Sequence, residues 1–235
     1  MSTLPYTLDQ DDPGVVPMGL IVLQTDETIE PEFAARFADD PNPLYVSRIA
    51  SAPVVSKDSL GEMETLLPAA ADLLPKARPY RVVGYGCTSA SSVIGSERVE
   101  TLVQQSCKTA HVTNPLRAAI ACAGHHSVSK LALLSPYVEE VNQPLRTAFA
   151  REGVTTDVFG TFGEAEEANV VRISTPSIVE AACKLGADPQ VEAIFLSCTN
   201  LRTQAAIPQI RARIGKPVLS SNQSLAWHMN RLNAT

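Results

Sequence analysis

The sequence predicts an α/β protein built from two pseudo-symmetric lobes, each a parallel β-sheet flanked by helices. Short runs rich in β-branched residues alternate with longer Ala- and Leu-rich segments of helical period, which is the pattern of successive βαβ units. The 235 residues suffice for one large core or for two small lobes that share one. A weak internal repeat favours two lobes, because RVVGYG before Cys87 is matched in the second half by AIFLS before Cys198.

The first lobe is expected to span residues 1–112. Its strands are short apolar runs, and its helices are the longer stretches in which apolar residues recur every three or four positions. In chain order we expect a strand at Val16–Leu23, a helix at Ile29–Ala38, a strand at Leu44–Ile49, a helix at Asp58–Leu74, a strand at Tyr80–Gly84 and a helix at Ser96–Cys107. Ser96 followed by Glu97 is a typical helix start.

The second lobe is expected to span residues 113–220, with a last helix within residues 221–235 that packs back on the first lobe. In chain order we expect a helix at Pro115–His125, a strand at Lys130–Leu134, a helix at Tyr137–Glu152, a strand at Thr156–Gly160, a helix at Thr175–Leu185, a strand at Ala193–Leu196, a helix at Ala205–Ile214, a strand at Pro217–Leu219 and a helix at Ser224–Arg231. Gly153 and Gly215 are typical helix stops.

Composition excludes several classes of function. Lys and Arg number 19 against 25 Asp and Glu, a net charge of −6 without any basic run, so nucleic acid is not an expected partner. No apolar stretch approaches the roughly 20 residues that cross a bilayer, and the polar, acidic start lacks a secretory signal. We therefore expect no membrane association and a cytoplasmic location. The five cysteines show no CxxC pair, which predicts free thiols and no metal site.

Two of the cysteines are the candidate catalytic residues. Cys87 and Cys198 each follow the carboxyl end of an apolar strand, the edge at which open α/β sheets bind ligands. Two facing lobes would place these thiols on opposite walls of one cleft. Removing a proton from one face of a carbon beside a carboxylate and returning it to the other face needs such a pair, one thiolate and one thiol. Cys107, Cys122 and Cys183 lie in Ala-rich helical stretches and are expected to be small buried apolar residues.

The segments around these residues resemble a known family. GYGCTSASSVIG, ALLSPYVEEVN, and LSCTNLR followed by IGKPVLSSNQSLAWH are similar to the aspartate/glutamate racemase superfamily, in the branch of maleate cis-trans isomerases, arylmalonate decarboxylases and ectoine-utilisation proteins. The last segment most resembles the ectoine-utilisation members, and the resemblance runs from about Met18 to Leu232. It implies a cleft between two lobes, no metal or organic cofactor, a homo-oligomer, and one catalytic cysteine per lobe at Cys87 and Cys198.

The same resemblance implies substrate-binding residues in the first lobe. Where maleate isomerases have Ser-Ser-Asn, this chain has Gln24-Thr25-Asp26. The aspartate is a departure, because a carboxylate at this point would repel a substrate carboxylate, whereas it would hold an ammonium group or act as a partner of the nearby thiol. The alternative is that Asp26 caps the following helix. Thr88 and Ser89, directly after Cys87, are expected in the same pocket.

In the second lobe the resemblance implies four more substrate-binding residues. Asn114 would donate to a substrate carboxylate, with a helix cap as the alternative. Tyr137 would orient a carboxylate, with half-buried packing as the alternative. Thr199 and Asn200, directly after Cys198, would offer hydroxyl, amide and backbone donors. Ser221 and Asn222 are expected either to complete the pocket or to close the lobe.

Three reactions are compatible with this frame, and the expected enzyme class is an isomerase. The first choice is a racemase or epimerase of a small carboxylate-bearing amino acid, such as a diaminobutyrate derivative formed during ectoine breakdown. The second is a maleate-type cis-trans isomerase with a cysteine nucleophile. An arylmalonate-type decarboxylase ranks third, because such enzymes replace the first cysteine by a small residue, and a non-catalytic binding protein is a further alternative. The sequence leaves open the natural substrate, the stereochemical outcome and which thiol is the thiolate.

Overall fold

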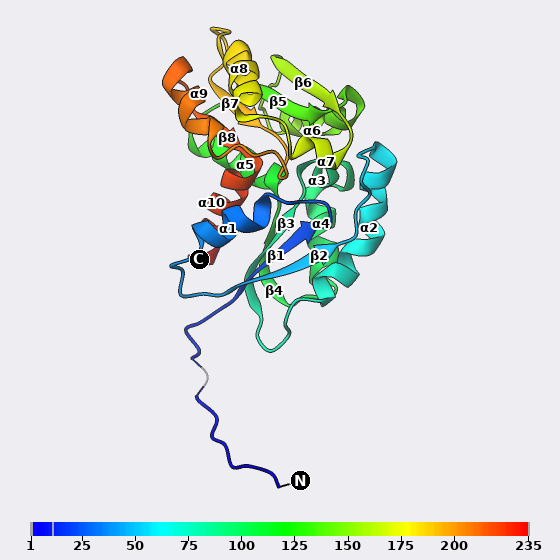
Figure 1. The fold of residues 1–235 in the computed structure, drawn as a ribbon, viewed down its shortest axis with the longest axis vertical. Coiled ribbons are helices and arrows are strands. Elements are labelled where there is room, and N and C mark those ends of the chain that lie inside the picture. Colours follow the sequence, from blue (N-terminus) through cyan, green and yellow to red (C-terminus); the bar gives the residue numbers. More distant parts are fainter. Residues whose placement is uncertain (1, 11, 235) are drawn as a thin grey trace.

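The computed structural model describes residues 2–10 and 12–234 and contains two four-stranded parallel sheets. The strand orders are β2-β1-β3-β4 and β6-β5-β7-β8, so the second sheet repeats the topology of the first. The strands are β1 (Met18–Leu23), β2 (Leu44–Ile49), β3 (Tyr80–Gly86), β4 (Thr109–Thr113), β5 (Leu131–Tyr137), β6 (Phe159–Glu164), β7 (Ala193–Leu196) and β8 (Val218–Ser220). The two sheets form two lobes, one above the other in Figure 1, and the predicted fold class is confirmed.

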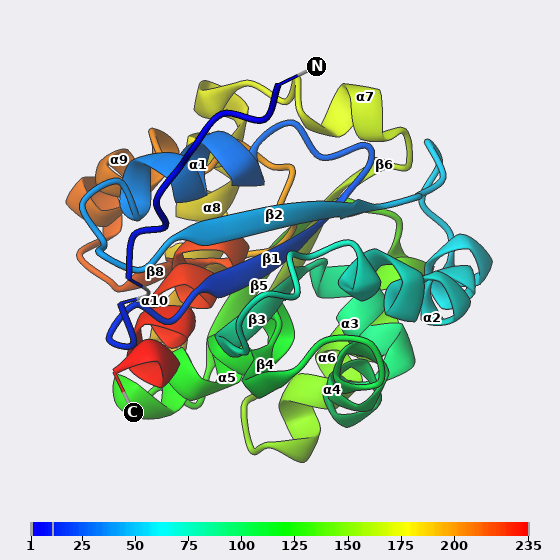
Figure 2. The same cartoon turned by 90° about the horizontal axis from the view of Figure 1, so that it is seen from below.

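Helices cover both faces of each sheet (Figures 1 and 2). They are α1 (Ile29–Arg36), α2 (Lys57–Asp72), α3 (Thr88–Ile94), α4 (Ser96–Gln104), α5 (Pro115–His125), α6 (Glu139–Arg151), α7 (Glu167–Val170), α8 (Thr175–Gly186), α9 (Ala206–Ile214) and α10 (Ser221–Asn233). In the first lobe α2 and α4 bury one face, while α1, α5 and α10 bury the other. In the second lobe α8 and α9 bury one face, while α5 and α6 bury the other. Because both faces are covered, β1 and β5 are buried along their whole length.

The last helix crosses from the second lobe to the first. α10 follows β8 of the second sheet but packs against β3, β4 and α1 of the first lobe and against α5. Gly84 on β3 permits this close approach, because a Cβ at that position would lie 2.7 Å from the sulfur of Met229 on α10. The start of α10 therefore lies where the two lobes meet.

Some elements differ from the sequence-based predictions. β4 was not predicted, because its TAHVT run is half exposed and carries too few apolar residues to stand out. β6 begins three residues later than expected, and Tyr137 ends β5 instead of opening a helix. α10 begins at Ser221, three residues before the predicted start, with Ser220 accepting a capping hydrogen bond from Gln223.

Candidate active site

Cys87 and Cys198 lie at equivalent positions of the two lobes and face one small cavity. Cys87 follows β3 and Cys198 comes two residues after β7, the corresponding strand of the second sheet. Both are buried, and both line a cavity of about 10 Å³ at the carboxyl ends of the strands. The remaining lining residues are Leu23, Asp26, Thr88, Ser89, Tyr137, Glu167, Thr199 and Asn200.

The two thiols have different local surroundings. Cys87 is the N-cap of α3, and its sulfur accepts a hydrogen bond from the Ala90 N–H at 3.3 Å. Cys198 has a backbone φ of +100°, a left-handed conformation that costs a non-glycine residue of the order of 1–3 kcal/mol. Its N–H donates to the Ser221 hydroxyl at 3.0 Å, and its sulfur accepts from the Asn200 N–H at 3.3 Å. The strained turn thus directs the thiol into the cavity.

Ser221, at the start of α10, joins the two cysteine loops. Its oxygen accepts from the Cys198 N–H and lies 2.7 Å from the Thr88 hydroxyl of the first lobe. Thr199 makes a second link, since its hydroxyl donates to the Gly86 carbonyl oxygen at 3.2 Å. The geometry between the thiols is therefore fixed by hydrogen bonds that cross from one lobe to the other.

A chain of hydrogen bonds connects Cys198 to a buried carboxylate. The Tyr137 hydroxyl donates to Glu167 Oε1 at 2.5 Å and lies 2.9 Å from Cys198 Sγ. A hydroxyl has one proton, and here it goes to Glu167, so the thiol is the donor to the Tyr137 oxygen. Glu167 Oε2 accepts from the Asn200 side-chain amide at 2.7 Å. This arrangement provides a path along which the Cys198 proton can pass through Tyr137 to Glu167.

Asp26 is the carboxyl group that the first lobe contributes to the cavity. Its Oδ1 accepts from the N–H groups of Thr28 and Ile29 at 2.8 and 2.9 Å, while Oδ2 is buried without a hydrogen-bond partner. Arg48 on β2 fixes the surrounding loop by donating to three carbonyl oxygens, one of them that of Asp26 itself. The side chain thus has the capping role that was the alternative to substrate binding, and it also lies beside Thr199 in the cavity lining.

Burial determines the protonation of the four titratable groups Cys87, Cys198, Asp26 and Glu167. It raises the pKa of Cys87 to about 12 and the pKa of Cys198 well above its ordinary value, and the charges of Glu167 and Asp26 act in the same direction. Burial also raises the pKa of Asp26 and the pKa of Glu167, against the hydrogen bonds that each accepts. No Lys, Arg or His lines this cavity among the described residues. Both thiols are consequently protonated at neutral pH in this environment.

The lobes are also bridged at the edge of the site. Val54, in the loop after β2, pairs with Glu166 in an antiparallel bridge, flanked by hydrogen bonds from the Val55 N–H to the Ala165 oxygen and from the Glu167 N–H to the Pro53 oxygen, both 2.9 Å. A cavity of about 10 Å³ holds roughly one water molecule. The structure is therefore the closed state, and a substrate must part the lobes to enter.

The structure brings together most of the predicted site residues. Cys87, Cys198, Asp26, Thr88, Ser89, Tyr137, Thr199 and Asn200 line the cavity. Thr25 does not; its hydroxyl lies 3.0 Å from that of Ser51, and its carbonyl oxygen accepts from Asn200. Asn114 caps α5, accepting from the Arg117 N–H at 3.0 Å, and lies outside the lining.

Glu167 lines the cavity without having been singled out from the sequence. The strand before it was predicted to end at Gly160, whereas β6 ends at Glu164, so this acid was not seen to follow a strand end. The signal that could have revealed it is the run Glu164-Ala165-Glu166-Glu167 after FGTFG.

Neither a metal-binding cluster nor a membrane-spanning helix is present among the described residues. No group of three or more His, Cys, Asp or Glu side chains is arranged to hold a metal ion within residues 2–10 and 12–234. In the same part of the chain, every helix is too short or too polar to cross a membrane.

Comparisons with known proteins give the family. The arylmalonate decarboxylase of Bordetella bronchiseptica is 31% identical over 122 residues, or 52% of this chain and 48% of that protein, so the match spans about half the length of this curated relative. Among solved structures, a Nocardia farcinica maleate cis-trans isomerase, a cysteine-to-serine mutant with a covalently bound succinylcysteine intermediate, has a TM-score of 0.80 at 22% identity over 93% of both chains. A crystal structure of arylmalonate decarboxylase has a TM-score of 0.72 at 23% identity over 92% of both chains. These structures share the fold. A family model described as "Amdase: Arylmalonate decarboxylase" matches residues 19–235, and the chain therefore belongs to the arylmalonate decarboxylase family.

Proposed function

We propose that the protein is a cofactor-independent racemase or epimerase of a small amino acid that carries a carboxylate, and that Cys87 and Cys198 exchange its α-proton. One observation carries the proposal: two thiols from opposite lobes share a cavity with two carboxyl groups, Asp26 and Glu167, and no basic side chain of the described residues lines it. Two acids attract an ammonium group and oppose a dianion. Once a substrate has displaced their contacts with Ser221 and with the Gly86 oxygen, the hydroxyl groups of Thr88 and Thr199 would hold the substrate carboxylate.

The ammonium group would also activate the thiols. The pKa of Cys198 is raised by burial and by the charges of Glu167 and Asp26. A cation close to the sulfur opposes these effects and favours the thiolate. The proton leaves Cys198 through Tyr137, which takes up the thiol proton as it passes its own to Glu167, along the contacts of 2.9 and 2.5 Å. Cys198 is then a thiolate and Glu167 a neutral acid.

The reaction follows from this state. The Cys198 thiolate takes the α-proton, and the electron pair of the broken C–H bond moves into the substrate carboxylate. The Cys87 thiol then donates its proton to the opposite face of the same carbon. A C–H bond forms on the opposite face of that carbon, Cys198 ends as the thiol and Cys87 as the thiolate. Return of protons through the solvent or the product restores the starting state.

The substrate class follows from the count of acids. Two carboxyl groups suit a substrate with a second amine or amide nitrogen, such as 2,4-diaminobutyrate or its N-acetyl derivative. The resemblance of residues 214–228 to ectoine-utilisation proteins supports the same choice. We further propose that the protein acts in the cytoplasm as a homo-oligomer on this small-molecule substrate, without nucleic acid or membrane partners.

A maleate-type cis-trans isomerase is the second candidate, and one observation favours it. Burial raises the pKa of Asp26 and the pKa of Glu167, and as neutral acids both would donate hydrogen bonds to a substrate dicarboxylate. One thiolate would add to the double bond while the other thiol protonates the neighbouring carbon, and elimination after rotation would restore both. The Nocardia isomerase with its succinylcysteine has the same fold. An arylmalonate-type decarboxylase ranks third because it needs no thiol at the Cys87 position.

The test is solvent-deuterium exchange at the α-carbon, followed by NMR. The panel holds both enantiomers of aspartate, glutamate, 2,4-diaminobutyrate and its N-acetyl forms, together with maleate and phenylmalonate. Wild type is compared with Cys87→Ser, Cys198→Ser and the control Cys183→Ser, whose thiol lies outside the cavity. We expect deuterium to enter a diamino acid with inversion, each active-site variant to lose racemisation by at least about a hundredfold, and the control to match wild type. Conversion of maleate to fumarate, or decarboxylation of phenylmalonate, without exchange in any amino acid would refute the racemase assignment.

A further inference from the structure

A large cavity lies away from the two thiols. It measures about 380 Å³ and shares no lining residue with the catalytic cavity. Its walls come from both lobes, namely α1, α5, the loop before α9, α9, β8 and the first two turns of α10. The catalytic cavity in the same closed structure holds about 10 Å³. The molecule therefore presents a second, preformed space of the size of a small organic ligand.

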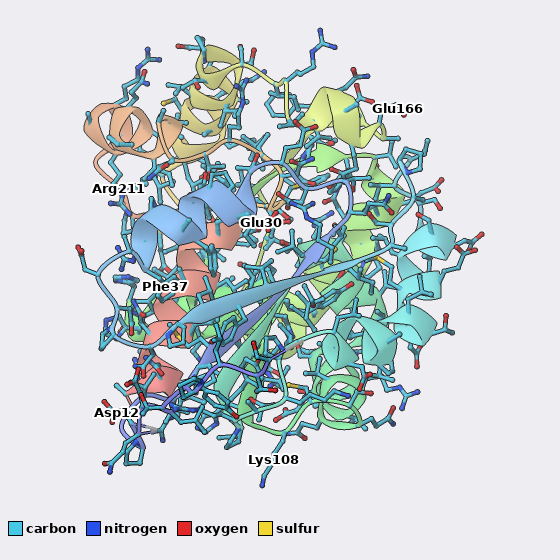
Figure 3. All side chains as sticks on the ribbon, turned by 60° about the horizontal axis from the view of Figure 1, so that its bottom comes forward. Asp12, Glu30, Phe37, Lys108, Glu166 and Arg211 are labelled. Atoms are coloured by element: carbon cyan, nitrogen blue, oxygen red, sulfur yellow. The ribbon has the colours of Figure 1, made fainter. Side chains whose placement is uncertain are left out.

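Basic side chains from two lobes line this space. Arg36 on α1 and Arg211 on α9 are both exposed lining residues, and neither forms an ion pair with a described residue. Arg211 lies where α9 approaches α1 (Figure 3). His126, the C-cap of α5, lines the same space. By contrast, Arg213, two residues along α9, pairs with Glu180 and is not part of the lining. Arg211 donates one hydrogen bond to the Val218 carbonyl oxygen at 2.8 Å, which holds the guanidinium at the wall and leaves its other N–H groups for a ligand. Two guanidinium groups without a carboxylate partner, on separate elements, suit a ligand with two carboxylates.

Two polar side chains of α10 belong to the lining. Asn222 is 3% exposed and Ser224 is 2% exposed, and Ser224 lies beside the Cys122 thiol, another lining residue. Asn222 Oδ1 has no hydrogen-bond partner, which is rare for a buried amide oxygen. The Asn222 amide donates to Glu32 Oε2 and to the Thr199 oxygen, both at 2.9 Å, which fixes its orientation.

Apolar side chains complete the lining. Phe33, Leu219, Ala226 and Trp227 provide a surface for the body of a ligand, with Trp227 held under the Arg231 guanidinium at 5.0 Å. We propose that this cavity is a second, non-catalytic binding site for a small dicarboxylate with an apolar or aromatic body, held by Arg36 and Arg211. The site is distinct from the proposed reaction, because the carboxyl groups that face the thiols oppose a dianion and the arginines here attract one.

Glu32 makes binding depend on pH. It is the one acid of the lining among the described residues, and burial raises its pKa to about 7, with the charge of Asp26 acting in the same direction. Arg36 on α1, Arg211 on α9 and His126 after α5 line the same cavity, and Asn222 on α10 donates a hydrogen bond to Glu32. A dianion favours the neutral acid, so binding weakens as pH rises through about 7 and Glu32 takes up its charge. Glu32→Gln keeps an oxygen for Asn222 and removes the charge.

The chain supplies its own reporter for this site. Trp227 is its single tryptophan and lines the cavity, so intrinsic fluorescence reports on this space directly. The probe is phenylsuccinate, titrated into the full-length wild type at pH 6.5, with the neutral phenylsuccinamide and inorganic phosphate in parallel. We expect a saturable change with phenylsuccinate alone. Arg36→Gln and Arg211→Gln each weaken the apparent affinity by about tenfold or more, while Arg213→Gln on the same helix leaves it unchanged.

The pH arm repeats the titration at pH 6 and 8. Wild type should bind more weakly at pH 8, and Glu32→Gln should show a smaller difference between the two pH values. His126→Gln is measured beside it, because that imidazole lines the same cavity. Absence of a saturable signal, equal binding by wild type and both arginine variants, or tighter binding of phosphate or the diamide would each overturn the proposal. A Glu32→Gln variant with the pH dependence of wild type would overturn the role given to Glu32.

Discussion

A cross-link between the lobes tests whether the closed state excludes ligands from the two thiols. Val54 and Glu166 form an antiparallel bridge whose flanking hydrogen bonds join Val55 to Ala165 and Glu167 to Pro53. This makes Val54 and Glu166 a non-hydrogen-bonded pair, with Cα atoms about 4.5 Å apart in regular geometry. That spacing lies within the range of disulfides, about 4.4–6.8 Å. Both side chains are exposed, so the double variant Val54→Cys/Glu166→Cys should oxidise without repacking the core.

The position of the bridge determines how much the disulfide stabilises the folded chain. The new disulfide closes a loop of about 110 residues, for which the loss of chain entropy in the unfolded state gives about 4.7 kcal/mol. In a chain of this length that corresponds to a Tm higher by about 10–20 °C in the oxidised form. The cavity of about 10 Å³ admits no reagent larger than water, so access to the thiols requires the lobes to part. The cross-link prevents this movement.

The assay is alkylation by iodoacetamide, read by peptide mass spectrometry. In the oxidised double variant we expect Cys87 and Cys198 to react at least about a hundredfold more slowly than after reduction. Cys183 on α8 is half-buried and outside the site, so it serves as an internal reference whose rate stays the same. Val54→Cys alone controls for the substitution. If the cross-linked protein is alkylated at Cys87 and Cys198 as fast as the reduced one, reagents reach the thiols without parting the lobes here, and the reasoning is refuted.

Three further predictions concern single residues. Gly84→Ala places a Cβ 2.7 Å from the Met229 sulfur and should lower the free energy of unfolding by about 1–3 kcal/mol, measured by urea denaturation; an unchanged midpoint would contradict the tight packing of α10 on β3. Burial lowers the pKa of His228 from 6.5 to about 4. Between these pH values the unfolded chain binds one proton more than the folded chain, so stability falls as pH drops from 6.5 to 4. His228→Gln should remove this part of the acid sensitivity, and an equal loss of stability in both proteins would exclude the role of His228. Glu167→Gln removes a charge that raises the pKa of Cys198, so alkylation of Cys198 at pH 8 should speed up while α-deuterium exchange falls about a hundredfold; a parallel fall of both would mean only misfolding.

The sequence predicted those parts of the fold that depend on local pattern. The structure gives Leu44–Ile49 and Ala193–Leu196 the predicted bounds. Ala193–Leu196 is a buried apolar run, and Leu44–Ile49, although a partly exposed edge strand, opens with three consecutive hydrophobic residues. The edge strands β4 and β6 are partly exposed and interrupted by polar residues or glycine, so their hydrophobic pattern is weak. β4 was missed and β6 was misplaced for this reason.

In the candidate site, too, the residues that follow from local pattern were predicted, and those that depend on distant contacts were not. Cys87 and Cys198 follow strongly apolar strands, and their shared cavity is the consequence of two sheets with one topology. Glu167 reaches the cavity because its backbone N–H binds Pro53 of the other lobe, a contact between residues more than a hundred positions apart. No local pattern carries such a contact. For Asn114 the sequence fits both a capping role and a binding role, and only the structure shows that its side chain caps α5.

The two halves share a topology but not an electrostatic environment, and this difference bears on the direction of proton flow. Cys198 is linked through Tyr137 to Glu167, a carboxyl group that can receive its proton. Among the described residues Cys87 has no comparable relay to a carboxyl group: its sulfur accepts from the Ala90 N–H, and the neighbouring Tyr85 hydroxyl donates to the Met63 sulfur. Asp26 Oδ1 is engaged by backbone N–H groups. A proton can therefore leave Cys198 within the closed site, whereas Cys87 retains its own. In the proposed reaction Cys198 is for this reason the first base and Cys87 the first acid, and the opposite assignment requires that the protons re-equilibrate while the lobes are open.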